Sequence, residues 1–129
     1  MDHAKYETPR EFYEILNDEF RFNCDPCPIN WIAGDPDGLE IEWGTSTFCN
    51  PPYANTAAWI RKAHAEWKKG KTVVMLINAI TDTKVFHEYI LGQAELRFVK
   101  GRICFVNRVL NAKKSPNSRP SMIVLFKSG

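Results

Sequence analysis

The 129-residue sequence has no long apolar run, no internal repeat and no low-complexity stretch. A membrane-spanning helix needs about 20 consecutive apolar residues, and the amino-terminal MDHAKYE lacks the features of a signal peptide. We therefore expect a cytoplasmic protein that contacts no membrane. Hydrophobic residues make up 44% and charged residues 25%, so the chain is expected to fold as a single globular domain, residues 1–129.

Cysteine is scarce, and its spacing does not make a metal site. Cys24 and Cys27 supply only half of a tetrahedral zinc site, Cys49 and Cys104 lie apart from them, and the three histidines show no ligand spacing. Disulfides are rare in the reducing cytosol. We therefore predict buried free thiols and no metal.

The formal net charge is only +2, but the two halves of the chain differ strongly. Residues 1–60 contain three basic and eleven acidic residues, a net charge of −8, whereas residues 61–129 contain fourteen basic and four acidic residues, a net charge of +10. Such asymmetry points to a polyanionic partner. If the two halves interleave in space, their opposite charges would instead cancel.

The hydrophobic pattern predicts alternating helices and strands, with strands gathered at the carboxyl end. Thr8 is expected to cap a helix over residues 9–19 with Pro9 as its first residue, and Asp82 to cap a helix over residues 83–91. The other expected elements are a helix over 56–69 and strands at 20–24, near 30–33, 46–49, 73–77, 96–99, 103–106 and 122–126. This order predicts an α/β domain with a mixed, mostly parallel sheet and an antiparallel carboxyl-terminal hairpin.

The most specific motif is Asn50-Pro51-Pro52-Tyr53, which follows a β-prone run. Ligands of α/β sheets bind at the carboxyl ends of strands, where Asp25 is also expected. The two prolines keep the backbone out of sheet pairing, so the Asn50 amide oxygen and the Pro51 carbonyl could accept both hydrogens of one amino group. Tyr53 offers a ring for stacking a planar substrate. A turn that merely ends a strand would also explain the motif.

Further segments occur in the order found in one enzyme family. They are Thr8-Pro9, Glu19-Phe20-Arg21-Phe22 with Asp25, Asp37-Gly38-Leu39 with Trp43, Phe48-Cys49 before the tetrapeptide, Trp59, Val73-Val74-Met75-Leu76, Thr81-Asp82-Thr83, Arg97-Phe98, Gly101-Arg102 with Phe105, and Ser121-Met122. Together with the tetrapeptide they resemble the phage-type DNA N6-adenine methyltransferases (Dam-like) over nearly the whole chain. The resemblance implies a compact Rossmann-like methyltransferase fold, S-adenosylmethionine as cofactor and methyl transfer to adenine N6 in DNA.

The resemblance also implies roles for individual residues. Asn50, Pro51 and Pro52 would form the catalytic motif that holds the amino group, and Tyr53 would stack on an adenine flipped out of the duplex. The residues expected to contact the cofactor are Thr8, Pro9, Asp25, Asp37, Gly38 and Leu39. A helix cap would explain Thr8 and Pro9 equally well, and plain loop residues would explain the other four.

Basic residues of the second half are expected to face DNA. Residues 107–120 are predicted to form a long basic loop whose cations suit phosphate and base-edge contacts. The expected DNA-binding residues are Lys100, Arg102, Arg108, Lys113, Lys114 and Arg119. A second basic cluster lies on and after the helix at 56–69, namely Arg61, Lys62, Lys68, Lys69 and Lys71. A solvated hairpin tip is the alternative for any single lysine.

Two other functions stay open. The tetrapeptide is shared with methyltransferases that act on RNA bases or protein glutamine. A non-catalytic DNA-binding relative that has lost the cofactor is the second alternative, because no glycine precedes Gly34 and the glycine-rich loop of many methyltransferases is absent. At this length we expect no separate recognition domain, so loops, chiefly residues 107–120, and a second subunit in a homodimer would supply recognition.

Overall fold

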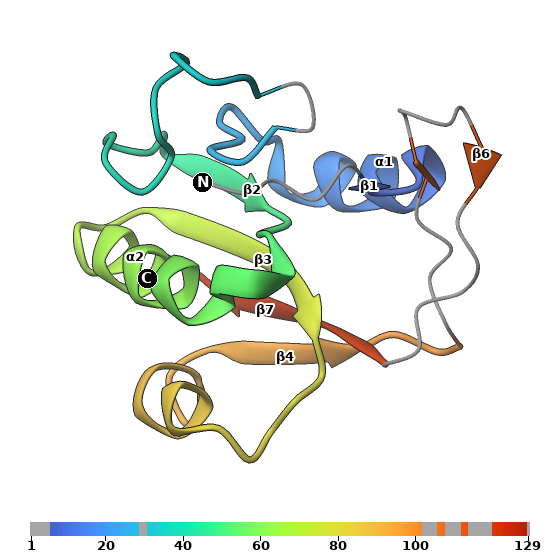
Figure 1. Cartoon of the computed structure of the whole chain (residues 1–129). Helices are drawn as coiled ribbons and strands as arrows, with labels where there is room; N and C mark the ends of the chain where they lie inside the picture. Colours follow the sequence, from blue (N-terminus) through green and yellow to red (C-terminus); the bar gives the residue numbers. More distant parts are fainter. Residues whose placement is uncertain (1–5, 29–30, 102–105, 108–111, 114–119, 129) are drawn as a thin grey trace.

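The structure is a computed structural model of the chain, and it describes residues 6–28, 31–101, 106–107, 112–113 and 120–128. Its main sheet has four strands in the order β2-β3-β7-β4 (Figure 1). These are β2 (Ser46–Cys49), β3 (Thr72–Asn78), β7 (Ser121–Phe126) and β4 (Glu95–Phe98). A smaller sheet has the order β1-β5-β6, with β1 (Tyr6–Glu7), β5 (Val106–Asn107) and β6 (Ala112–Lys113).

One of the three strand pairs in the main sheet is parallel. β2 runs parallel to β3, with Ser46 opposite Thr72, whereas β7 is antiparallel to both β3 and β4. The α/β class and the antiparallel carboxyl-terminal strands are confirmed. The prediction of a mostly parallel sheet is wrong, because β7 lies between β3 and β4. A Rossmann-like fold is not confirmed.

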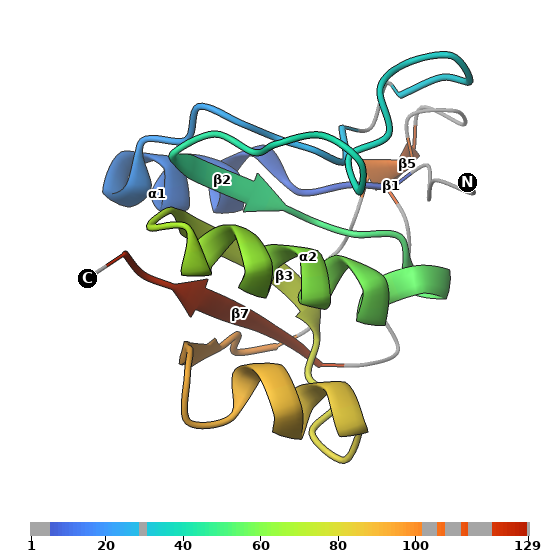
Figure 2. The ribbon, with the colours of Figure 1, turned by 90° about the vertical axis from the view of Figure 1, so that its left-hand side faces the viewer.

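Helices cover both faces of the main sheet (Figures 1 and 2). On one face lie α2 (Thr56–Lys68) and the single-turn π-helix η2 (Phe86–Ile90). On the other face lies α1 (Arg10–Phe20), which contributes the buried Leu16. The sheet is therefore the middle layer of a three-layer arrangement.

Strand β3 forms the centre of the core. Alternate side chains of a strand point to opposite faces, and here Val73, Met75 and Ile77 pack with α2 while Val74 and Leu76 pack with α1. All five residues are at most 6% exposed. The strand predicted at 73–77 is thus confirmed, and both of its faces are covered.

Near the amino terminus the predicted boundaries differ from the observed ones. The N-cap of α1 is Pro9, so Thr8 does not cap the helix. The strand predicted at residues 20–24 is reduced to one parallel bridge between Cys24 and Thr47. The reason is that α1 extends through Phe20 and is ended by Arg21, which has a left-handed φ of 53°.

Three further predictions change in detail. Residues 31–33 form no strand. The helix predicted over 83–91 is shorter and covers residues 84–90. Its Phe86 N–H donates to the hydroxyl of Thr83 at 3.2 Å, so the capping side chain is Thr83 and not Asp82. Of the strand predicted at 103–106, only its last residue lies within the described residues, as the start of β5. No described helix is long and apolar enough to cross a membrane.

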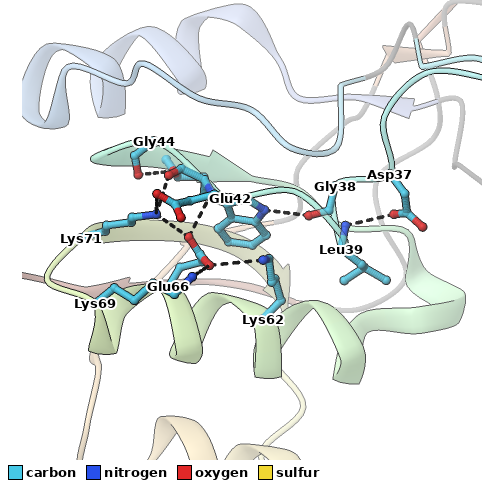
Figure 3. A network of polar contacts seen from close by, with 11 residues as sticks. Asp37, Gly38, Leu39, Glu42, Gly44, Lys62, Glu66, Lys69 and Lys71 are labelled. Carbon is cyan, nitrogen blue, oxygen red and sulfur yellow. Dashed lines mark hydrogen bonds and ion pairs between the residues drawn. The ribbon is translucent and has the colours of Figure 1, made fainter.

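A buried carboxylate on α2 joins three parts of the chain (Figure 3). Glu66 is 1% exposed and accepts hydrogen bonds from the ammonium groups of Lys71, Lys69 and Lys62 at 2.6, 2.9 and 3.2 Å. It also accepts the backbone N–H of Trp43 at 3.0 Å. Burial acts to raise the pKa of Glu66, but these four donors outweigh it and hold the pKa at about 2. Glu66 therefore fixes the loop before β2 and the start of β3 onto α2.

This network corrects the expectation that the cations on and after α2 form one DNA-facing cluster. Glu66 forms ion pairs with Lys62, Lys69 and Lys71. The ammonium group of Lys71 also lies 3.5 Å from the carboxylate of Glu42 in the acidic half. The contact between Lys71 and Glu42 joins the two halves of the chain and offsets part of their opposite charge.

We expect Glu66→Gln to lower the free energy of unfolding at pH 7 by about 3 kcal/mol, because it leaves lysine ammonium groups around a site without countercharge. The wild type should lose stability as the pH falls from about 5 toward 2, since a carboxyl whose folded-state pKa is lowered stabilises only while ionised. Urea denaturation at pH 7 and pH 3 measures both effects. Glu88→Gln, in an exposed pair with Lys84, is the control and should change stability by less than about 1 kcal/mol. Equal losses in the two variants would contradict the account.

Candidate functional site

Two chain segments leave the main sheet at the same edge. Cys24 pairs in parallel with Thr47, and its carbonyl accepts the Phe48 N–H at 3.0 Å. Parallel segments end on the same side of a sheet, so Asp25 and Asn50 both emerge at the carboxyl edge. This is the edge where α/β sheets bind ligands, as the sequence predicts.

The segment before α1 holds the side chain of Asn50. Its Nδ2 donates a hydrogen bond to Oγ1 of Thr8 at 3.0 Å, and both residues are half-buried. No donor to Asn50 Oδ1 occurs in the described part of the chain, so this oxygen is free to accept. The structure thus joins two residues that the sequence assigned to different groups: Asn50 to catalysis and Thr8 to the cofactor or a helix cap.

The two prolines after Asn50 set the path of the backbone. Both are buried, and Pro52 is extended with φ −60° and ψ 139°. The Pro52 carbonyl accepts from Asn55 and Thr56 in the following helical turns, whereas that of Pro51 accepts no hydrogen bond from any described residue. The role of the Pro51 carbonyl as an acceptor for the amino group stays a prediction. The placement of the predicted stacking ring of Tyr53 lies outside what the structure describes.

Asp25 lies where a carboxylate could meet a cation. Although the residue is accessible at the surface, surrounding protein atoms raise the pKa of its carboxyl to about 6, and the Cys27 N–H bonded to it at 3.0 Å offsets only part of this rise. At neutral pH the group is therefore mostly ionised. A cationic ligand would stabilise it.

A surface pocket of about 230 Å³ opens beside this carboxyl. The indole N–H of Trp31 donates to the Pro36 carbonyl at 2.9 Å, and the Asp35 carboxylate accepts the Ile32 N–H at 3.1 Å, which orders one wall. The lining residues are Asp25, Pro26, Pro28, Trp31, Asp35, Pro36 and Ile41. Of these only Asp25 was predicted, because a composition rich in proline, glycine and aspartate indicates a loop without indicating which side chains share a wall.

Asp37, Gly38 and Leu39 form a tight turn (Figure 3). Asp37 Oδ1 accepts the Leu39 N–H at 2.9 Å, and the Gly38 carbonyl accepts the indole N–H of Trp43 at 2.7 Å. A Cβ at position 38 would collide with the Pro26 carbonyl oxygen, so glycine is required by packing. These contacts favour the plain-turn explanation for Asp37 and Gly38, and contact of the three residues with the cofactor stays a prediction.

The cysteines near the site are free thiols. Cys24, Cys27 and Cys49 form no disulfide, and Cys49 is fully buried. Burial, with the nearby charge of Asp25, raises the pKa of Cys27 to about 12 and that of Cys49 well above its ordinary value. Such thiols are poor nucleophiles. Cys104 lies outside the described residues.

The predicted DNA-binding residues are only partly described. Lys100 is exposed after β4, and Lys113 lies in β6. Residues 107–120 are not one uninterrupted loop, because they include the end of β5 and all of β6. Arg102, Arg108, Lys114 and Arg119 lie outside the described residues.

The site combines the anchored Asn50 amide, the adjacent Pro51 carbonyl and an acidic pocket at the carboxyl edge of an α/β sheet, and neither the amide oxygen nor that carbonyl accepts a hydrogen bond from a described residue. These features are those of an enzyme that acts on a planar amino group. A family model described as DNA N-6-adenine-methyltransferase (Dam) matches residues 1–128. A DNA N-6-adenine-methyltransferase of Haemophilus phage HP1 (strain HP1c1) is 30% identical over 137 residues, covering 97% of this chain and 79% of the relative.

The chain therefore belongs to the Dam family of DNA N-6-adenine-methyltransferases. The match favours adenine in DNA over RNA bases and protein glutamine as the acceptor.

We expect the Asp25 carboxyl to titrate near pH 6 in the folded chain. A carboxyl whose folded-state pKa is raised weakens the fold as it ionises, so its effect appears as the pH rises from about 4 to about 6. Asp25→Asn should therefore match the wild type at pH 4 and exceed its stability at pH 7. Urea denaturation at both pH values, with carbon NMR titration of the Asp25 carboxyl, tests this. A titration midpoint near 4 together with equal stability at pH 7 would refute it.

Proposed function

We propose that this chain transfers a methyl group from S-adenosylmethionine to adenine N6 in DNA, and that the oxygens of Asn50 and Pro51 hold the amino group. The anchored Asn50 amide is the observation that carries the proposal. Its Nδ2 is bonded to Thr8 while Oδ1 has no donor among the described residues, and the neighbouring Pro51 carbonyl is also unpaired among them. Two acceptors in succession match the two hydrogens of an amino group.

Two accepted hydrogen bonds would make adenine N6 a better nucleophile. The nitrogen lone pair is ordinarily delocalised into the purine ring. Acceptors that hold both hydrogens favour a more tetrahedral nitrogen with its lone pair directed out of the ring plane. Orientation and fixed dipoles then supply most of the rate enhancement. A strong general base is unnecessary, because a methylated cationic nitrogen loses its proton readily to water.

The target base must leave the duplex to reach this site. Base flipping costs a few kcal/mol, and stacking on an aromatic ring returns about 1–3 kcal/mol. We assign this stacking role to Tyr53, which directly follows the two prolines. Pro52 would keep the motif rigid by holding the backbone extended at the start of η1 (Tyr53–Asn55).

The residues beside Asp25 suit S-adenosylmethionine, which supplies an electrophilic methyl group when bound. Its positive charges would be matched by Asp25 and Asp35, and its planar base by the apolar wall that contains Trp31. The pocket volume of about 230 Å³ is enough for one part of such a molecule. The other contacts are assigned to Thr8, Pro9, Asp37, Gly38 and Leu39.

DNA contacts are assigned to basic residues of the carboxyl-terminal half. Lys100 and Lys113 belong to this set, together with Arg102, Arg108, Lys114 and Arg119. Cations of this kind hold the phosphate backbone, and their neighbours read bases. We also propose that the chain acts in the cytoplasm and that a homodimer extends the DNA-contacting surface.

Asn50→Ala should abolish methyl transfer while leaving cofactor binding nearly unchanged, because it removes one acceptor for the amino group and no cofactor contact. Tritiated S-adenosylmethionine on DNA measures transfer, and calorimetry measures binding. Asn55→Ala, at an exposed position on the next turn, is the matched control and should retain activity. Full activity of Asn50→Ala would exclude the assigned role.

Cofactor affinity should depend on the ionisation of Asp25. If its carboxylate binds the cofactor ammonium group, affinity should fall up to about tenfold per pH unit below the free-state pKa of about 6. Asp25→Asn should bind weakly at all pH values, without this dependence. Calorimetry between pH 5 and 8 provides the test. A pH-independent wild-type affinity would remove Asp25 from the site, and no binding at any pH would favour the non-catalytic alternative.

A further inference from the structure

We propose that Thr8 is a positioning residue for the catalytic amide: its hydroxyl holds Nδ2 of Asn50 and so keeps Oδ1 directed toward the target amino group. This inference deepens the proposed function and rests on it. The observation is the hydrogen bond of 3.0 Å from Asn50 Nδ2 to Thr8 Oγ1, which joins residues 42 positions apart in the chain.

The orientation of the amide decides whether the site can work. An Asn side chain presents an acceptor on one side and an NH₂ donor on the other. If the NH₂ group faced the substrate, it would meet the hydrogens of the adenine amino group, and the acceptor would be lost. A partner that offers the amide only a lone pair therefore selects the productive orientation.

The local fold explains why Thr8 is available for this task. The N-cap of α1 is Pro9, so the Thr8 side chain is not used by the first turn of the helix. Thr8 directly follows β1, whose Glu7 pairs with Val106 in the smaller sheet. Strand pairing on one side and the helix start on the other fix the backbone at Thr8, and the hydroxyl is held against Asn50 by elements remote in sequence.

The hydroxyl keeps its own hydrogen while accepting from Asn50. It can therefore donate to an acceptor on the other side, which is compatible with the predicted contact of Thr8 with the cofactor. When the hydroxyl donates its hydrogen to another acceptor, it can offer Asn50 only a lone pair. If the amide were then reversed, its oxygen would face that lone pair and receive no hydrogen bond. The two roles of Thr8 consequently support one another.

Three variants separate positioning from cofactor binding. Thr8→Val replaces the hydroxyl by a methyl group of nearly the same size, and we expect kcat to fall by roughly 10- to 100-fold, with a smaller loss of cofactor affinity because the variant also removes one cofactor contact. Thr8→Ser keeps the hydroxyl and should retain kcat within about threefold. Thr72→Val, at the remote end of β3 where the hydroxyl contacts Ser128, controls for the general effect of this substitution.

A second measurement needs no activity. In the wild type without cofactor, one Asn50 side-chain amide proton should exchange slowly with solvent in nitrogen-resolved NMR. That protection should disappear in Thr8→Val, persist in Thr8→Ser and be unaffected in Thr72→Val. If Thr8→Val does not fold, the wild-type and Thr8→Ser spectra still decide the point.

Each outcome has a definite meaning. Unprotected Asn50 amide protons in the wild type, or a Thr8→Val kcat equal to that of the wild type, would overturn the positioning role. A weaker Kd with an unchanged kcat would make Thr8 a cofactor contact alone. Absence of methyl transfer by the wild type would instead refute the proposed function, and the NMR measurement would still test the hydrogen bond.

Discussion

The parallel alignment of the Cys24 segment, β2 and β3 is the constraint on which the rest of the structure depends. Parallel pairing of β2 with β3, and the bridge from Cys24 to Thr47, send these segments out of the sheet at one edge. Asp25 and Asn50 therefore reach the same edge of the sheet, although they lie 25 positions apart in the chain. The antiparallel strands β7 and β4 extend the sheet away from this edge pair and complete the core, but they do not place the candidate site.

Two polar contacts then adapt this small sheet to function. Glu66, buried among three lysines, fixes the loop before β2 to α2, and its position explains why much of the positive charge near α2 serves the fold. Thr8 brings the segment before α1 to Asn50. Stability and positioning thus depend on separate groups in this chain of 129 residues: Glu66 with its lysines on one side, and Thr8 with Asn50 on the other. The acidic pocket at Asp25 takes part in neither contact.

Local signals in the sequence predicted local features well. The apolar run at β3, the prolines after Asn50 and the helical periodicity of α2 each gave the correct element. The sheet topology was not predictable in the same way, because nothing in the sequence around β7 indicates that it inserts between β3 and β4. Thr8 is a similar case: its sequence context favours a helix cap, whereas the fold brings its hydroxyl to the Asn50 amide. Lys62 and Lys69 lie at helical spacing from Glu66, so the sequence allows these two pairs. The burial of Glu66 and its contacts with Lys71 and Trp43 come from the tertiary fold and were not predictable.

The central claim is that this site methylates adenine N6 in DNA, and nucleoside mass spectrometry tests it most directly. The purified chain is incubated with DNA of mixed sequence and S-adenosylmethionine, and the DNA is digested and analysed, with RNA and protein acceptors in parallel. We predict N6-methyladenine in the DNA and no methyl groups on the other acceptors. Unmodified adenine in the DNA, or methylation confined to another base, RNA or protein, would contradict the account.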